Sequence, residues 1–277
     1  MKKISRRSFM AAAAVSVAAL AMTACGGSAS SAASSVASSA ASSEAASSAA
    51  ADLTTVEAGK LTMATNAAFP PYEMTTDAGE FEGIDVDTAK AIAEKLGLEL
   101  QIDDMDFDAA LLSVQQGKAD IVMAGVTVTD ERKAVMDFSD SYATGIQSII
   151  VPEGSDITSP DDLAGKKIGT QRGTTGYIYC SDDFGDENVV AYDDGLTAVQ
   201  ALNNGQVDAV VIDNAPAQEF VAANPGLKVL DTSYAEEDYA IGMAKGSALE
   251  DAVNKALEEL KADGTLQAIV DKYINAN

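Results

Sequence analysis

The chain has 277 residues with 18 basic and 43 acidic side chains, and its formal net charge of −25 disfavours nucleic acid and anionic lipid surfaces as partners. It contains no histidine, which excludes Ser-His-Asp catalysis and histidine-ligated zinc and leaves an enzyme only carboxylate, lysine or tyrosine chemistry. We predict neither a cofactor nor a bound metal.

Residues 1–24 are typical of an export signal. Four cations and no acid precede an apolar run that reaches Met22, and small residues follow it. The run is too short to span a bilayer comfortably. Ser5–Phe9 is similar to a twin-arginine signal. An ordinary secretory signal with two arginines fits as well, so the export route stays open.

A lipid anchor and a tether are expected next. Met22–Cys25 resembles the lipobox of bacterial lipoproteins, with Met22 in place of the usual leucine, so Cys25 is predicted to become an acylated N-terminus. Residues 25–57 are predicted to form the tether, because residues 26–51 hold eleven serines and eleven alanines and no periodic apolar face. Acylation of Cys25 would leave Cys180 alone, and we expect it to be structural. The protein is therefore expected outside the cytoplasm, held to the membrane through its lipid.

The first part of the folded chain alternates strands and helices. Two prolines, Pro70 and Pro71, interrupt regular structure after the first strand. A helix carries Asp85 and Asp87 near its positive N-terminus. In order, the pattern predicts a strand over 60–65, a helix over 83–97, a strand over 98–102, a helix over 109–116 and a strand over 121–123.

The second part continues this alternation and adds two longer extended runs. Ser159 and Pro160 are typical of an N-cap and a first helical position. Strands that alternate with helices favour a mainly parallel sheet. We predict extended runs over 145–151 and 238–244 that cross between two units, strands over 167–170, 188–192, 208–212 and 227–230, a helix over 196–204, and final helices over 247–261 and 264–274.

One local pattern occurs twice. A helix ends at Gly117 and a short apolar strand follows, and the same sequence of features recurs at Gly205. The repeat suggests two similar α/β lobes. Since open α/β sheets bind ligands beyond the carboxyl ends of their strands, both lobes would present polar residues to one crevice. Arg132 from one lobe and Asp213 from the other would suit a zwitterion.

Seven motifs in sequence order resemble the bacterial extracellular solute-binding proteins of family 3, the amino-acid receptors of ABC importers. The resemblance covers essentially all of residues 60–273. The motifs are Asn66–Tyr72, Gly83–Asp87, Phe107–Leu111, Thr127–Arg132, Phe138–Asp140 with Tyr142, Gly169–Gly176 and Asp208–Asp213.

The resemblance implies an α/β type II periplasmic-binding-protein fold, in which two lobes are joined by two crossing strands and close over ligand like a hinge. On this reading lobe 1 comprises residues 58–143 and 239–277, and lobe 2 comprises residues 144–238.

The resemblance also implies the two ionic contacts of the site. Arg132 would clamp the α-carboxylate, because a planar guanidinium can donate two parallel hydrogen bonds. Asp213 would receive the α-ammonium. Without the family context, Arg132 could be a solvated surface charge and Asp213 an N-cap of the next helix, and the N-cap role is compatible with binding.

Further ligand contacts are implied around this pair. Turn chemistry is the alternative for the threonines, and core packing is the alternative for the aromatic residues. Asn66 replaces an acid that relatives often carry, and the neutral Gln171 favours a polar ligand. The expected contacts are Gly125 and Thr127 from lobe 1, Thr174 and Thr175 from lobe 2, Phe69 and Phe107 around the ligand side chain, and Asn66 and Gln171.

The resulting hypothesis is a monomeric, non-catalytic receptor that captures a free L-amino acid and delivers it to an ABC permease and its ATPase. A ligand-sensing component of a signalling system is one alternative. A dehydratase-like enzyme on the same fold is another, disfavoured because histidine is lacking and both ionic anchors are present. Fold analogy alone does not separate these functions.

Overall fold

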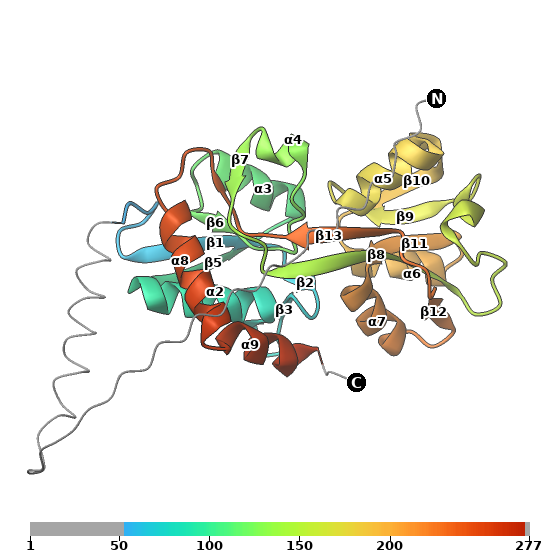
Figure 1. Cartoon of the computed structure of the whole chain (residues 1–277). Helices are drawn as coiled ribbons and strands as arrows, with labels where there is room; N and C mark the ends of the chain where they lie inside the picture. Colours follow the sequence, from blue (N-terminus) through green and yellow to red (C-terminus); the bar gives the residue numbers. More distant parts are fainter. Residues whose placement is uncertain (1–52, 275–277) are drawn as a thin grey trace, which may run out of the picture.

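The computed structural model describes residues 53–274. The predicted signal, Cys25 and most of the predicted tether lie outside the described residues. Two α/β lobes lie side by side and are joined by two long strands (Figure 1). Within residues 53–274, no helix is both long enough and apolar enough to cross a membrane.

Lobe 1 is built on a five-stranded sheet in the order β5-β1-β6-β14-β7. Its strands are β1 (Lys60–Thr65), β5 (Glu99–Asp104), β6 (Ile121–Val122), β7 (Met136–Phe138) and β14 (Gly242–Ala244). A small sheet of β2 (Ala68–Phe69), β3 (Glu73–Thr75) and β4 (Phe81–Glu82) lies beside it. The helices are α2 (Ile84–Leu96), α3 (Phe107–Gln115), α4 (Asp130–Lys133), α8 (Glu250–Ala262) and α9 (Thr265–Tyr273).

Lobe 2 is built on a second sheet in the order β10-β9-β11-β8-β12, with β13 paired to β8. Its strands are β8 (Ala143–Pro152), β9 (Ile168–Gln171), β10 (Val189–Tyr192), β11 (Ala209–Asp213), β12 (Leu227–Val229) and β13 (Ala235–Tyr239). The helices are α5 (Thr175–Phe184), α6 (Gly195–Asn203), α7 (Asn214–Ala223) and the short 3-10 helices η1 (Pro160–Leu163) and η2 (Asp186–Asn188).

Helices cover both faces of each sheet, so the central strands are buried on both sides and their apolar sequences suit this position. In β1, five of six residues are buried, and all five residues of β11 are buried. Continuous rather than alternating apolar runs are what parallel, two-sided sheets require. Cys180 is a free, buried thiol in the core of lobe 2, as expected for a structural side chain.

The four strands of lobe 2 from which the sequence predicts a mainly parallel sheet, β9 to β12, all run in one direction, but β8 is inserted among them in the opposite direction. β9 pairs in parallel with β10 and β11, but β8 pairs antiparallel with β11, β12 and β13. Five of the six strands therefore run in the same direction, and only β8 is reversed. The reason is that β8 enters from lobe 1, so its direction is set by the crossing and not by an α/β unit.

β8 and β13 form the connection between the lobes. Residues 143–147 pair antiparallel with residues 235–239 (Figure 1). The predicted single run over 238–244 is divided, because β13 ends at Tyr239 and β14 begins at Gly242. Between them the chain changes sheets, and the Ala240 N–H donates to the Val126 carbonyl at 3.1 Å. The lobe boundaries predicted from the sequence fall near the lobe 1 ends of these two strands.

The folded chain begins before residue 58. Leu53 packs against the core of lobe 1, and the Val56 N–H donates to Asp120 Oδ1 at 2.7 Å. Asp120 Oδ2 accepts from the Thr62 N–H at 2.8 Å, so this buried carboxylate ties the incoming chain to β1. Residues 53–57 of the predicted tether are therefore part of the lobe.

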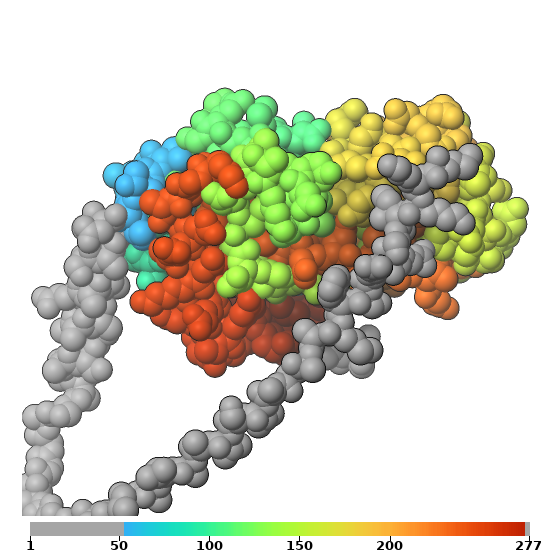
Figure 2. Space-filling view, turned by 45° about the horizontal axis from the view of Figure 1, so that its top comes forward, coloured from blue at the N-terminus to red at the C-terminus, as the bar shows by residue number. Residues whose placement is uncertain are grey.

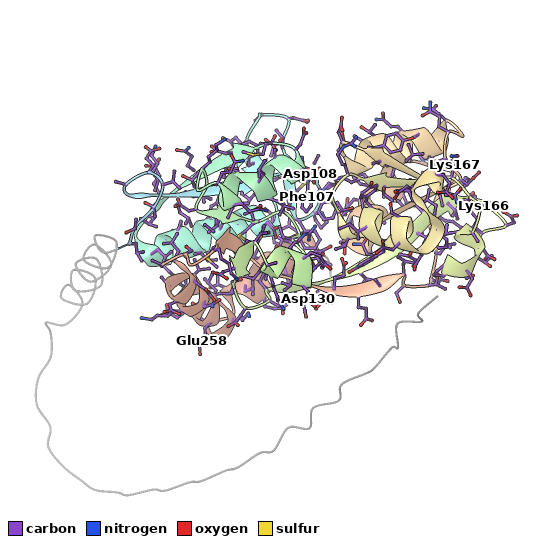
Figure 3. The ribbon with its side chains drawn as sticks, turned by 90° about the horizontal axis from the view of Figure 1, so that it is seen from above. Phe107, Asp108, Asp130, Lys166, Lys167 and Glu258 are labelled. Carbon is purple, nitrogen blue, oxygen red and sulfur yellow. The ribbon has the colours of Figure 1, made fainter. Side chains whose placement is uncertain are left out.

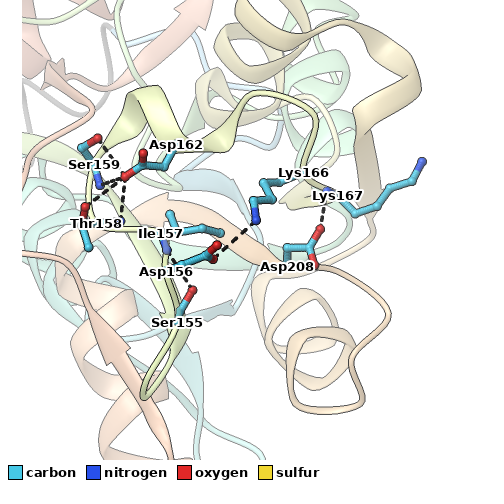
Figure 4. Close-up of polar contacts among 9 residues, drawn as sticks. All are labelled: Ser155, Asp156, Ile157, Thr158, Ser159, Asp162, Lys166, Lys167 and Asp208. Carbon is cyan, nitrogen blue, oxygen red and sulfur yellow. Dashed lines mark hydrogen bonds and ion pairs between the residues drawn. The ribbon is translucent and has the colours of Figure 1, made fainter.

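The start of the predicted short helix at Ser159 is present as η1. Its Ser159 and Asp162 form a capping box, and Asp162 Oδ2 also accepts from the Thr158 N–H at 2.9 Å (Figure 4). Nearby, the Lys167 N–H donates to Asp208 Oδ2 at 2.8 Å, which ties the start of β9 to that of β11. Reciprocal capping satisfies donors that a short helix would otherwise leave free.

Gly83 is required where α2 begins. Its φ is 132°, and a Cβ atom there would overlap the carbonyl of Tyr72. Gly83→Ala should lower the free energy of unfolding by about 3–5 kcal/mol, from backbone strain and overpacking together. The measurement is denaturant unfolding. Gly79→Ala is the matched control, since Gly79 also has positive φ but faces open space, and it should cost about 1–2 kcal/mol. Equal losses in the two variants would contradict this role.

Candidate ligand-binding site

A small cavity of about 30 Å³ lies between the lobes. All ten ligand-contact residues predicted from the sequence line it. They are Asn66, Phe69, Phe107, Gly125, Thr127, Arg132, Gln171, Thr174, Thr175 and Asp213. Six further described residues complete the wall: Glu73, Ala124, Gln147, Val211, Ile212 and Tyr239.

The sheets explain why these residues meet. Asn66 follows β1 and Ala124 follows β6, and these strands are parallel neighbours. Gln171 and Asp213 are the last residues of β9 and β11, which are parallel neighbours in the other lobe. The carboxyl ends of both sheets therefore face the same cavity, as expected for open α/β sheets.

Arg132 is held in place from both lobes. Its Nη1 donates to the Thr127 carbonyl at 2.8 Å and its Nη2 donates across the lobes to the Gly173 carbonyl at 3.1 Å. The guanidinium lies over the ring of Phe107, 5.3 Å from its centroid. The side chain is only 8% exposed, and burial lowers its pKa from the ordinary value. A guanidinium has five N–H donors, so three are not used in these two bonds.

A local cap fixes the arginine's backbone. Thr129 is the N-cap of α4, and its Oγ1 accepts from the Arg132 N–H at 3.2 Å. Because α4 has only four residues, this one hydrogen bond holds the backbone of Arg132 at the first turn of the helix. The predicted alternative of a solvated surface arginine does not fit the observed burial.

Asp213 is buried and hydrogen-bonded to backbone. Its Oδ1 accepts from the Ala215 N–H at 3.0 Å, which makes it the N-cap of α7, and its Oδ2 accepts from the Ile146 N–H at 2.8 Å. Each carboxylate oxygen keeps a second acceptor site, so the cap role leaves room for an ammonium group. Burial raises the pKa of Asp213 to about 6, more than the two backbone hydrogen bonds lower it.

The lobes touch through polar contacts around the cavity. Thr127 Oγ1 lies 3.4 Å from Thr175 Oγ1, and Gln171 Nε2 donates to Asn66 Oδ1 at 2.8 Å. Figure 2 shows the atoms of the two lobes meeting along a shared boundary. A space of about 30 Å³ holds a few water molecules at most, so an amino acid can enter only if the lobes separate.

The aromatic residues serve both the cavity and the core. Phe107 belongs to a buried cluster of lobe 1, and Phe69 packs against the cores of both lobes. Phe69 stacks on Tyr72 with ring centroids 5.7 Å apart, and Tyr72 meets Tyr239 edge-on at 5.4 Å. The two predicted roles for Phe69 and Phe107, cavity wall and core, therefore coexist.

Sequence reasoning missed four polar residues. Glu73 directly follows a recognised motif and could have been included. Gln147 and Tyr239 lie on the crossing strands, whose register the sequence does not reveal. Glu237 lies one layer behind the cavity, where its Oε2 accepts from Thr127 Oγ1 and Gln147 Nε2, both at 3.0 Å.

Comparison with known proteins decides the family. Residues 61–276 match the family described as bacterial extracellular solute-binding proteins, family 3. The chain belongs to this family. The L-cystine-binding protein TcyJ of Escherichia coli is 34% identical over 226 residues, which cover 80% of this chain and 85% of TcyJ.

Solved structures of amino-acid-binding proteins agree in fold. The arginine-, lysine-, histidine-binding protein ArtJ of Geobacillus stearothermophilus is 35% identical with a TM-score of 0.75, covering 79% of this chain and 96% of ArtJ. An ancestral arginine-binding protein, solved with glutamine and with arginine, is 43% identical with a TM-score of 0.75. The glutamine-bound structure covers 78% of this chain and 98% of that one. The two-lobed type II periplasmic-binding-protein fold predicted from the sequence is confirmed.

Ligand affinity should fall as the pH drops through about 6. A positively charged ligand group placed at Asp213 would need its ionised form, and protons would compete for that form once the pH is below its pKa. Affinity for an amino acid should be about tenfold lower at pH 5 than at pH 7.5, measured by calorimetry. Asp213→Asn should bind more weakly and lose most of this pH dependence. An unchanged pH profile in Asp213→Asn would contradict the assignment.

Closure depends on the lack of a side chain at Gly173. Its φ is +73°, and a Cβ atom there would overlap the Asp108 carboxylate of lobe 1. Asp108 and Phe107 lie on the side of lobe 1 that faces lobe 2 (Figure 3). Gly173→Ala should weaken ligand affinity about tenfold or more and reduce the ligand-induced compaction seen by small-angle X-ray scattering. Gly165→Ala, with positive φ but open space, is the control. If Gly173→Ala compacted on ligand binding as much as Gly165→Ala does, a steric role of Gly173 in closure would be ruled out.

Proposed function

We propose that this protein is an extracytoplasmic receptor that binds one free L-amino acid between its lobes and delivers it to an ABC importer. The observation that carries the proposal is that Arg132 and Asp213, from opposite lobes, line one cavity between them. A guanidinium and a carboxylate on one small cavity complement the two charges common to every amino acid.

The proposed contacts follow from the donors and acceptors that remain. Arg132 offers unused N–H donors to the α-carboxylate, and Thr127 and Thr175 add hydroxyl groups on either side of the cavity. Asp213 receives the α-ammonium. Phe69 and Phe107 provide apolar wall area, and Gly125 and Thr174 complete the surroundings.

A polar ligand side chain is favoured. Asn66 and Gln171 bring two neutral amide groups to the cavity from opposite lobes. Relatives named for cystine, arginine, lysine and histidine, and a structure bound to glutamine, support a polar amino acid.

In this proposal, closure of the two lobes tells the importer that ligand is bound. Ligand that touches both lobes favours the closed arrangement, because only there are all of its contacts made together. The closed surface is then what the permease and its ATPase recognise. We place the hinge at the ends of β8 and β13, with lobe 1 comprising residues 53–143 and 239–274 and lobe 2 comprising residues 144–238.

We further propose that the protein is a monomer, that it performs no catalysis, and that acylated Cys25 anchors it to the outer side of the cell membrane through the Ser/Ala-rich segment. The relatives are binding proteins, and members of the family act outside the cytoplasm. Mass spectrometry of membrane-extracted protein would detect the acyl chains on Cys25.

A thermal-shift screen tests the proposed function. The purified protein, refolded to remove carried-over ligand, is measured against the twenty standard amino acids. Ligand at about 100 times its dissociation constant should stabilise the fold by about 2.7 kcal/mol. No shift with any amino acid would count decisively against the receptor function.

The role of Arg132 has a separate test. Arg132→Ala should weaken binding at least about 100-fold with an unchanged circular dichroism spectrum, because a buried carboxylate of the ligand would lose its partner. Arg172→Ala, at a nearby exposed arginine, is the control and should bind normally. Normal affinity in Arg132→Ala would remove it from the site.

A further inference from the structure

Tyr239 is a wall residue of the cavity that the proposed ligand contacts leave without a role. It is the last residue of β13, is only 1% exposed, and lines the cavity together with Asp213. Its backbone is bridged to Thr127 of lobe 1, so it lies at the lobe 1 end of a crossing strand. Its side chain therefore reaches the cavity from the proposed hinge.

Two glycines make room for the Tyr239 ring. A Cβ atom on Gly145 of β8 would overlap the ring and the hydroxyl of Tyr239. A Cβ atom on Gly125 of lobe 1 would lie 3.3 Å from Cε2, on the other edge of the ring. The ring of Tyr72 meets it edge-on, with centroids 5.4 Å apart. Because the Tyr239 ring is held from three sides, its hydroxyl has little freedom to move.

The hydroxyl of Tyr239 lies beside the carboxylate of Asp213. It is placed over Gly145, and the next residue, Ile146, donates its N–H to Asp213 Oδ2 at 2.8 Å. The two short hydrogen bonds to Asp213 come from the backbone of Ile146 and Ala215, and Tyr239 is the side chain that adds a donor. Burial and the nearby Asp213 hold the pKa of Tyr239 well above its ordinary value, so its hydroxyl keeps the proton that it donates.

The donor from Tyr239 favours the ionised form of Asp213. Burial raises the pKa of Asp213 to about 6, whereas the two backbone N–H groups and then Tyr239 lower it. Within the described residues, no other side chain donates a hydrogen bond to this carboxylate. The other titratable and charged groups around Asp213 are Glu237 on β13, Tyr72 and Glu73 in lobe 1, and Arg132 in the wall of the same cavity.

We propose that Tyr239 is a positioning residue, whose hydroxyl orients the Asp213 carboxylate to receive the ligand's ammonium group and whose place on β13 links that orientation to the hinge. This inference rests on the proposed function and adds a residue that acts through Asp213. Tyr239 lies on the lobe 1 side of the proposed boundary and Asp213 lies in lobe 2. Rotation that opens the cavity moves the two groups apart, so the ammonium site is fully oriented only when the lobes close.

Tyr239→Phe tests this role, because it keeps the ring and removes only the hydroxyl. The probe is whichever of the twenty standard amino acids stabilises the wild-type protein most. Its affinity at pH 7.5, measured by calorimetry, should fall about tenfold, the effect of one hydrogen bond to a charged group. The pH below which affinity declines should also rise from about 6 towards 7, because Asp213 loses a donor to its ionised form. A purely structural role would not move this pH profile.

A second variant and a control accompany Tyr239→Phe. Gly145→Ala should push the hydroxyl end of Tyr239 away and change affinity and pH profile in the same direction. Tyr234→Phe removes a hydroxyl that donates to Asp183 Oδ2 at 2.6 Å, outside the cavity, and should keep the wild-type affinity and profile. Burial also raises the pKa of Asp85 to about 6, but Asp85 is common to all these proteins. Differences between the variants therefore report on Asp213.

The outcomes separate this inference from the proposed function. Wild-type affinity in Tyr239→Phe would overturn the inference and leave the receptor function intact. Weaker binding with an unchanged pH profile would also overturn it, because Tyr239 would then contact the amino acid itself or only fill space. If Tyr239→Phe does not fold, an unchanged pH profile in Gly145→Ala overturns the inference instead. Failure of every amino acid to bind the wild-type protein would contradict the proposed function.

Discussion

The rest of the site depends on one constraint: two side chains of opposite charge are buried on facing lobes, away from water. Arg132 and Asp213 are each less than one-tenth exposed and line one cavity. Burying such charges is costly, and both are supported by backbone groups that fix their orientation. The cap at Thr129, the start of α7 and the crossing strand β8 are therefore parts of the site as well as of the fold.

The two crossing strands connect this electrostatic arrangement to motion. Ile146, on β8, donates to Asp213, while Tyr239, at the end of β13, forms part of the cavity wall. Thr127 bridges to Tyr239, so lobe 1 is in contact with the same strand. A rotation of the lobes about these strands changes the distance between the anchors, and a ligand that satisfies both anchors resists reopening. Binding and closure are then one equilibrium.

Much of the fold could be predicted because it depends on local patterns. β1 spans the predicted residues, and α2 differs from its prediction by one residue at each end, since Gly83 and Gly97 mark both ends of that helix. The family resemblance also led to ten residues that line the cavity. The insertion of β8 between β11 and β12 in the opposite direction was missed, because the direction of this strand depends on which lobe the chain comes from.

Glu73 and Gln147 show where sequence reasoning stops. Glu73 directly follows a recognisable motif, but nothing in its neighbours along the chain indicates that the fold buries it without a donor. Gln147 faces the cavity only because of the register of β8 with β13, which no local pattern encodes. The charge balance of the cavity therefore emerges only in three dimensions.

The most direct test of the central claim is a crystal structure of the refolded protein with a bound amino acid. The account predicts an α-carboxylate on the Arg132 guanidinium and an α-ammonium within hydrogen-bonding distance of the Asp213 carboxylate, both in the interlobe cavity. A ligand that contacts only one of these residues, or binds outside this cavity, would contradict it.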